Sequence, residues 1–225
     1  MGLLRMQKTP QGVPPQPGLA RLTLSEAFVE TAADAAALGF ALARLPRGQR
    51  PLLWVQDRLS RKESGYPSLA GLGAARPLIT LHLSRAADVL WAMEEGLRCR
   101  SLGGVIGEIW GDPAALDFTA TKRLALRSEA AGVPCWLIRR AAHPNLSAAR
   151  DRWRIGARPS APHPHDSQAP GAPRWAVDLF RSRHAKPGAW VATYDRAADR
   201  VDLVAAVSDR TLDAGDGPAG QRAAG

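Results

Sequence analysis

The chain has 225 residues, of which 45% are hydrophobic and 23% are charged, a composition that excludes a disordered or fibrous protein. This length suffices for one good-sized α/β core with appendages, whereas two full domains would each be small. The formal net charge of +9 comes almost wholly from arginine, because lysine occurs only at positions 8, 62, 122 and 186. Such a charge fits either a nucleic-acid partner or a solvated basic surface.

Neither a membrane segment nor a disulfide framework is predicted. The N-terminus lacks an apolar leader, and no run approaches the roughly 18 apolar residues that a membrane span needs. Cys99 and Cys135 lack the spacing of a metal or redox motif and are interpreted as core residues. We therefore expect a cytoplasmic protein that makes no membrane contact.

The two ends of the chain are rich in Gly, Pro and small polar residues, which predicts disordered tails over 1–20 and 209–225. Between them, over 21–208, apolar runs and amphipathic segments alternate in a βα pattern that is typical of a mainly parallel sheet. Strands are predicted at 27–30, 51–56, 78–83, 103–110 and 133–138, and helices at 34–45, 86–97 and 113–131. Asp112 is the expected N-cap of the third helix, and a polar loop is expected after Asp57.

Beyond residue 150, apolar residues recur at every second position. This pattern predicts strands at 153–157, 175–179, 190–194 and 201–207, added in antiparallel fashion to one edge of the sheet. The connection 159–173 holds five prolines in fifteen residues, so we expect a loop without regular structure there.

The loop after the first strand is where an α/β fold of this kind would bind phosphate through helix N-terminal amides. Here that loop is Glu30-Thr-Ala-Ala-Asp34, which has no G-x-x-x-x-G-K-[ST] motif and two acids instead. We therefore predict that the protein is not an enzyme and binds no nucleotide cofactor.

Other candidate chemistry is weaker. Glu108 ends an apolar strand, where nucleotide hydrolases keep a carboxylate that holds a metal ion. Because the phosphate-binding loop is absent, we interpret Glu108 as a carboxylate that bonds nearby backbone at a sheet edge. Asp57 is interpreted in the same way. The run His163-Pro-His165-Asp166 is interpreted as a loop, because no second ligand cluster accompanies it. No metal site is predicted.

A basic cluster is the remaining signal. Between 139 and 158 there are six arginines against one acid, Asp151, placed where α/β sheets bind ligands at the carboxyl ends of strands. The candidate DNA or partner contacts are Arg139, Arg140, Arg150, Arg152 and Arg154. A plain solvated surface is the alternative.

Several segments strongly resemble the ImuA family of bacterial SOS-mutagenesis proteins: Leu90-Trp-Ala-Met-Glu-Glu95, Gly107-Glu-Ile-Trp-Gly-Asp-Pro113, Leu116-Asp-Phe-Thr-Ala-Thr-Lys-Arg-Leu124, Arg152-Trp-Arg154, Gly171-Ala-Pro-Arg-Trp175 and Asp178-Leu-Phe180. The resemblance covers roughly residues 22–208. It implies a RecA-like three-layer α/β core in which 141–150 takes the position of the second DNA-binding loop of RecA recombinases.

This resemblance implies a non-catalytic accessory protein of SOS-induced translesion synthesis, located at the nucleoid. The implied partners are ImuB, a Y-family polymerase homologue, an error-prone C-family DNA polymerase and possibly RecA, with direct DNA binding also open. Two alternatives remain: a SulA-like SOS inhibitor of cell division, and a degenerate nucleotide-binding ATPase that uses Glu108.

Overall fold

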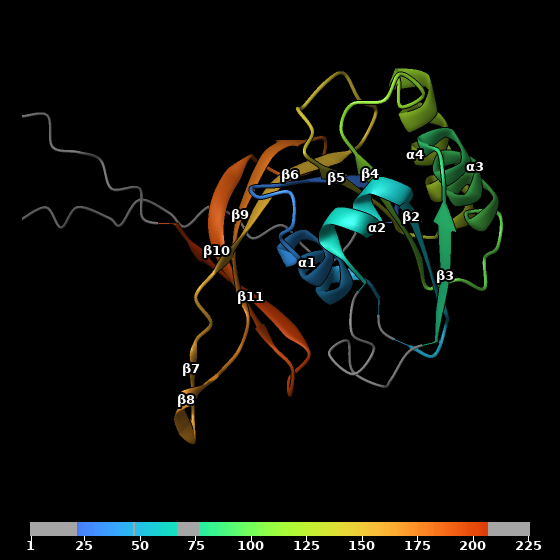
Figure 1. Cartoon of the computed structure of the whole chain (residues 1–225). Coiled ribbons are helices and arrows are strands. Elements are labelled where there is room, and N and C mark those ends of the chain that lie inside the picture. Colours follow the sequence, from blue (N-terminus) through green and yellow to red (C-terminus); the bar gives the residue numbers. More distant parts are fainter. Residues whose placement is uncertain (1–21, 47, 67–76, 207–225) are drawn as a thin grey trace, which may run out of the picture.

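A computed structural model of the chain describes residues 22–46, 48–66 and 77–206 (Figure 1). The predicted tails, 1–20 and 209–225, lie outside these residues. The described part is organised around one nine-stranded sheet, accompanied by four helices and a short two-stranded hairpin.

The sheet is parallel over six strands and antiparallel at one end. Its order, from one edge to the other, is β11 (Arg200–Ala205), β10 (Gly188–Asp195), β9 (Arg174–Ser182), β6 (Asp151–Arg158), β1 (Leu24–Val29), β5 (Cys135–Arg140), β4 (Gly104–Trp110), β2 (Leu52–Asp57) and β3 (Leu78–Leu83). All neighbours from β6 to β3 are parallel, whereas β9, β10 and β11 continue from β6 in antiparallel fashion.

Helices cover both faces of the parallel part (Figure 1). Helix α1 (Ala36–Arg44) packs on one face, where its Phe40 meets the rings of Trp136, Trp153 and Trp175. Helices α3 (Ala86–Gly96) and α4 (Phe118–Ala131) pack on the other face in a separate aliphatic cluster. The predicted three-layer, RecA-like α/β fold with antiparallel strands at its C-terminal edge is therefore confirmed.

Several local predictions need correction. Strand β6 is a parallel partner of β1 and starts at Asp151, so the antiparallel addition begins only at β9. Helix α4 begins later than expected, because the Asp117 side chain accepts the amide of Ala120 at 2.7 Å and caps the helix there. Its end is as predicted, since Gly132 takes the left-handed conformation at φ 67°.

Two segments expected to be loops contain regular structure. The residues after Asp57 form a short helix, α2 (Arg58–Ser64), because the Asp57 carboxylate accepts the Ser60 amide at 2.7 Å. Within 159–173, β7 (Pro162–His163) and β8 (Asp166–Pro170) pair as a hairpin. Prolines fit there because a two-stranded ribbon leaves each strand an unpaired side.

None of the helices in the described ranges has the length and apolar character needed to cross a membrane. Within the same ranges, no group of three or more His, Cys, Asp or Glu side chains is arranged to hold a metal ion. His163 and His165 lie in the β7–β8 hairpin with ring centroids 6.0 Å apart.

The close packing of α3 on β4 gives a test of this core. A Cβ at Gly107 would overlap the buried thioether of Met93, so Gly107→Ala should lower the free energy of unfolding by about 1–3 kcal/mol. Urea denaturation measures the change. In a Met93→Ala background, which vacates the space, the same substitution should cost clearly less; equal costs in the two backgrounds would contradict this packing.

Candidate functional site

The carboxyl ends of β1, β4 and β5 meet at the loop that joins β1 to α1, the position examined for phosphate binding. Asp34 ends that loop, and its carboxylate accepts the amides of Ala36 at 2.7 Å and of Ala157 at 2.8 Å. The first bond engages the amide at the start of α1, and the second ties the loop to β6. The protein's own carboxylate therefore binds a helix N-terminal amide of the kind that would hold a phosphate oxygen.

Arg140, at the end of β5, reaches the same loop from the other side. Its Nη1 donates to the carbonyl oxygens of Ala32 and Asp34, both at 2.8 Å, and its Nε donates to Glu108 at 2.8 Å. Phosphate-binding loops turn amide hydrogens toward their ligand. Here two loop carbonyls point at a guanidinium instead, so the loop is arranged around a cation of the protein itself.

Glu108, in β4, is fully buried and saturated by neighbouring donors. Besides Arg140 it accepts the Trp54 indole at 3.1 Å and the Gln56 amide at 3.4 Å. It therefore lies inside the sheet and bonds side chains from β2 and β5, and the expected role of bonding backbone at a sheet edge is wrong. A carboxylate held this way has no face open to a metal ion.

Asp57 has the predicted structural role. In addition to capping α2, its carboxylate accepts the Trp110 amide at 2.9 Å and so links the ends of β2 and β4. The next residue in that turn, Gly111, has a φ of 68°, which favours glycine. Asp112 follows and pairs with Arg139 at 2.5 Å. The Gly-Glu-Ile-Trp-Gly-Asp-Pro segment is thus one connected network across β2, β4 and β5.

Every arginine of the predicted basic cluster has an acidic partner. The pairs are Arg139 with Glu26 and Asp112, Arg140 with Glu108, Arg150 with Glu129, Arg152 with Glu26, Arg154 with Asp178, and Arg158 with Glu30. These acids come from β1, β4, α4, β9 and intervening loops, far from the arginines in sequence. The apparent excess of six cations over one acid is therefore neutralised by the fold.

Burial divides the five candidate contacts into two groups. The side chains of Arg139, Arg140 and Arg152 are at most 5% exposed. Arg150 is 13% exposed and Arg154 is 52% exposed, so an external ligand can reach Arg154 most easily. DNA or partner contact by the five remains a prediction.

The two groups also differ electrostatically. Burial lowers the pKa of Arg139, and the nearby carboxylates of Glu26 and Asp112 oppose that effect. At the surface, the hydrogen bond between Arg150 and Glu129 raises the pKa of the arginine and lowers that of the glutamate.

Segment 141–150, the expected counterpart of a DNA-binding loop, is anchored at both ends. The amide of His143 donates to Asp112 at 3.1 Å, and the amide of Ala148 donates to the Thr121 hydroxyl of α4 at 3.0 Å. Between these anchors Leu146 is 68% exposed. The loop therefore presents an apolar tip on a fixed base.

The sequence singled out Arg140 as a possible DNA contact and Glu108 as a possible metal ligand, but it did not indicate that they bind each other. One signal was available: both residues lie near the carboxyl ends of predicted apolar strands. Because parallel strands end at the same edge of a sheet, such residues can come close together.

A scan of protein families finds no family model that matches the chain. Two curated proteins are similar to it, the ImuA proteins of Caulobacter vibrioides strains NA1000 / CB15N and ATCC 19089 / CIP 103742 / CB 15. Each is 34% identical over 152 residues, which is 62% of this chain and 59% of the relative. The chain thus spans about three fifths of the length of the relatives it matches. Over the matched residues, the chain is therefore similar to ImuA proteins.

Proposed function

We propose that this chain is a non-catalytic, RecA-like accessory protein of SOS-induced, error-prone translesion synthesis. It acts at the nucleoid in the cytoplasm as an adaptor between ImuB and the mutagenic polymerase. The observation that carries the proposal is the β1–α1 loop, which is filled by Asp34 and Arg140, within a chain similar to ImuA proteins.

The groups in the loop argue against ATP hydrolysis on physical grounds. A triphosphate would have to displace the Asp34 carboxylate from the Ala36 amide and approach a second acid, Glu30. Metal binding by Glu108 would break a buried ion pair, which leaves Arg140 uncompensated in the interior at a cost of about 3–5 kcal/mol. The site therefore favours a fixed scaffold over nucleotide turnover.

An adaptor needs stable surfaces and no moving catalytic parts. The carboxyl ends of the parallel strands are locked by the Glu108–Arg140 and Asp112–Arg139 pairs. Loop 141–150 is tied to this base through Asp112 and has Leu146 exposed, and Arg154 of β6 is also exposed. Such a surface suits contact with a protein or with DNA, and the arginine cluster is proposed for that contact.

Association with ImuB is the first test. The purified full-length chain should form a complex with ImuB and the C-family polymerase in size-exclusion chromatography, and deletion of its gene should lower damage-induced mutation frequency. A chain that associates with neither protein and whose deletion leaves mutation frequency unchanged would refute the adaptor role.

Nucleotide binding should be absent. Equilibrium dialysis with labelled ATP and Mg²⁺ is expected to show no binding up to about 1 mM ligand, which bounds any binding free energy at about −4 kcal/mol. ATP binding in the micromolar range that Glu108→Gln abolishes would favour the degenerate ATPase instead.

The buried ion pair should contribute strongly to folding. Arg140→Ala should lower the free energy of unfolding by about 3–5 kcal/mol, because it leaves the Glu108 carboxylate buried without its cation. Arg154→Ala is the matched control: its exposed pair with Asp178 should contribute at most about 1 kcal/mol. Chemical denaturation compares the two, and similar losses would contradict the structural role of Arg140.

If the arginine cluster contacts DNA, the accessible members should carry the affinity. Replacement of Arg150 and Arg154 by alanine should weaken single-stranded DNA binding and flatten its dependence on salt. Fluorescence anisotropy across a salt series measures both quantities. Salt-insensitive binding, or an unchanged slope, would assign these arginines to the fold alone.

A further inference from the structure

Strand β3 is an edge strand without the usual protection. Among the described residues it pairs only with β2, so the backbone donors and acceptors on its outer side have no strand to pair with. Edge strands are commonly protected by charged residues or proline. The sequence of β3, Leu-Ile-Thr-Leu-His-Leu, contains neither, whereas the opposite edge strand, β11, carries the Arg200–Asp202 ion pair.

The side chains of β3 add apolar surface to this edge. Ile79 is 46% exposed and Leu81 is 38% exposed, and both lie on the same face because strand side chains alternate. On the other face Thr80 and His82 contact Tyr66, which stacks on Trp54. Among the described residues, the edge is therefore supported by its neighbours on one side and has no strand paired on its outer side.

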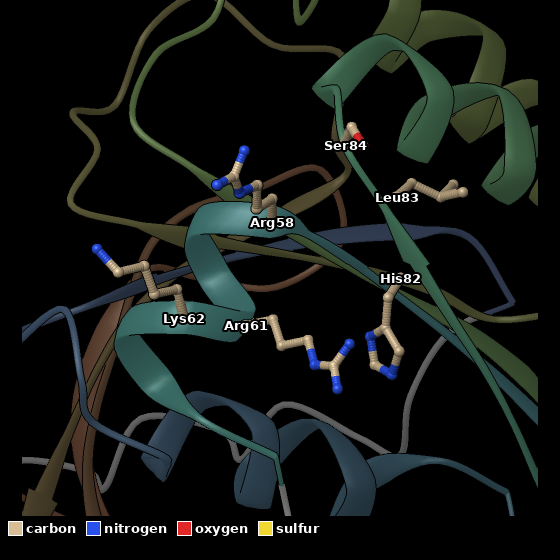
Figure 2. A pocket seen from close by; sticks show the side chains of 6 residues that line it. All are labelled: Arg58, Arg61, Lys62, His82, Leu83 and Ser84. Carbon is tan, nitrogen blue, oxygen red and sulfur yellow. The ribbon is translucent and has the colours of Figure 1, made fainter.

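A basic pocket of about 410 Å³ lies at the carboxyl end of the same strand. Its lining comes from α2 and from the end of β3: Arg58, Arg61, Lys62, His82, Leu83 and Ser84. Figure 2 shows Arg61 and His82 reaching toward each other across the space between α2 and β3.

Within the part of the chain that the structure describes, the arginines of this pocket lack acidic partners. Neither Arg58 nor Arg61 makes an ion pair with another residue in the described ranges, in contrast to the arginines of 139–158. Lys62 has only an exposed partner, Glu63, at 3.4 Å. Burial, followed by the neighbouring charge of Arg61, lowers the pKa of His82. The pocket is suited to carboxylates or phosphates.

We propose that the β3 edge docks an extended, acidic segment of a partner protein. The segment adds a strand beside β3, covers Ile79 and Leu81 with apolar side chains, and places acidic side chains against Arg58, Arg61 and Lys62. This inference rests on the proposed adaptor function and deepens it by naming the chemistry of the partner segment.

Two observations favour a peptide over a nucleic acid. Unpaired backbone groups of a strand are matched by another peptide backbone, the mode of recognition called strand addition. Phosphates would use only the basic end and leave Ile79 and Leu81 uncovered. A strand of six residues, as in β3, is about 20 Å long, so the partner segment needs about six extended residues with its acids at the end beside Ser84.

The test uses the full-length chain and ImuB, the partner of the proposed function. The double variant Arg58→Glu/Arg61→Glu reverses the charge of the pocket, and Ile79→Lys places a charge on the exposed edge. The double variant and Ile79→Lys both alter exposed side chains. Arg181→Glu/Arg196→Glu is the matched control, with the same change in charge at exposed positions of β9 and of the turn between β10 and β11.

Both test variants should weaken the complex by about tenfold or more, and the control should change affinity by less than about twofold. Hydrogen exchange of the wild-type chain adds a readout that needs no variant: the amides of β3 should exchange more slowly in the complex. An array of overlapping ImuB peptides should show binding to extended acidic segments, lost with Arg58→Glu/Arg61→Glu.

The outcomes separate the two proposals. If the wild-type chain binds ImuB while the variants keep their affinity and β3 gains no protection, the docking edge is wrong and the adaptor role stands. If the wild-type chain binds neither ImuB nor its peptides, the adaptor role fails, and the docking proposal fails with it. If the charge reversal abolishes binding of an oligonucleotide but leaves ImuB binding intact, the pocket is a nucleic-acid site, which also overturns the inference.

Discussion

The ion pair between Glu108 and Arg140 holds together the part of the molecule where function is expected. One guanidinium joins β5 to the carboxylate of β4 and to two carbonyl oxygens of the β1–α1 loop. Two charges buried this deeply are tolerated only while each is fully hydrogen-bonded, so the three elements keep fixed positions. Since Asp34 also bonds the first amide of α1 and an amide of β6, this constraint extends from the centre of the sheet to the strand on which the antiparallel part is added.

The fold pairs many of the arginines with carboxylates, and this pairing determines which parts of the surface carry net positive charge. The arginines of 139–158 look like one positive surface in the sequence, but each meets a carboxylate that the topology brings from elsewhere. Arg58 and Arg61 meet none within the described ranges, so they offer uncompensated charge beside an open strand edge. Position relative to the acids, more than the density of arginine, therefore decides which surface attracts an anionic partner.

Local patterns predicted much of the fold. Strand β3 has its predicted bounds. Helix α3 follows from the helical spacing of its apolar residues, and the end of α4 follows from Gly132. The direction of β6 was missed because one buried face gives the same alternation in parallel and antiparallel neighbours. The start of α4 was missed because Asp112 and Asp117 are both good caps, and Asp112 is instead engaged by the distant Arg139 and by the amide of His143. Likewise, nothing within the local window around residue 140 indicates Glu108, so the site depended on contacts between residues far apart in the chain.

In the proposed adaptor role, a chain similar to ImuA proteins uses an α/β core whose β1–α1 loop is filled by Asp34 and Arg140, and it acts through contacts with partners. The most direct measurement is the dissociation constant of the complex between the full-length chain and ImuB, determined with and without saturating ATP and Mg²⁺. The account predicts a measurable constant that is the same in both conditions. A complex that forms only with ATP, or that ATP strengthens severalfold, would contradict it.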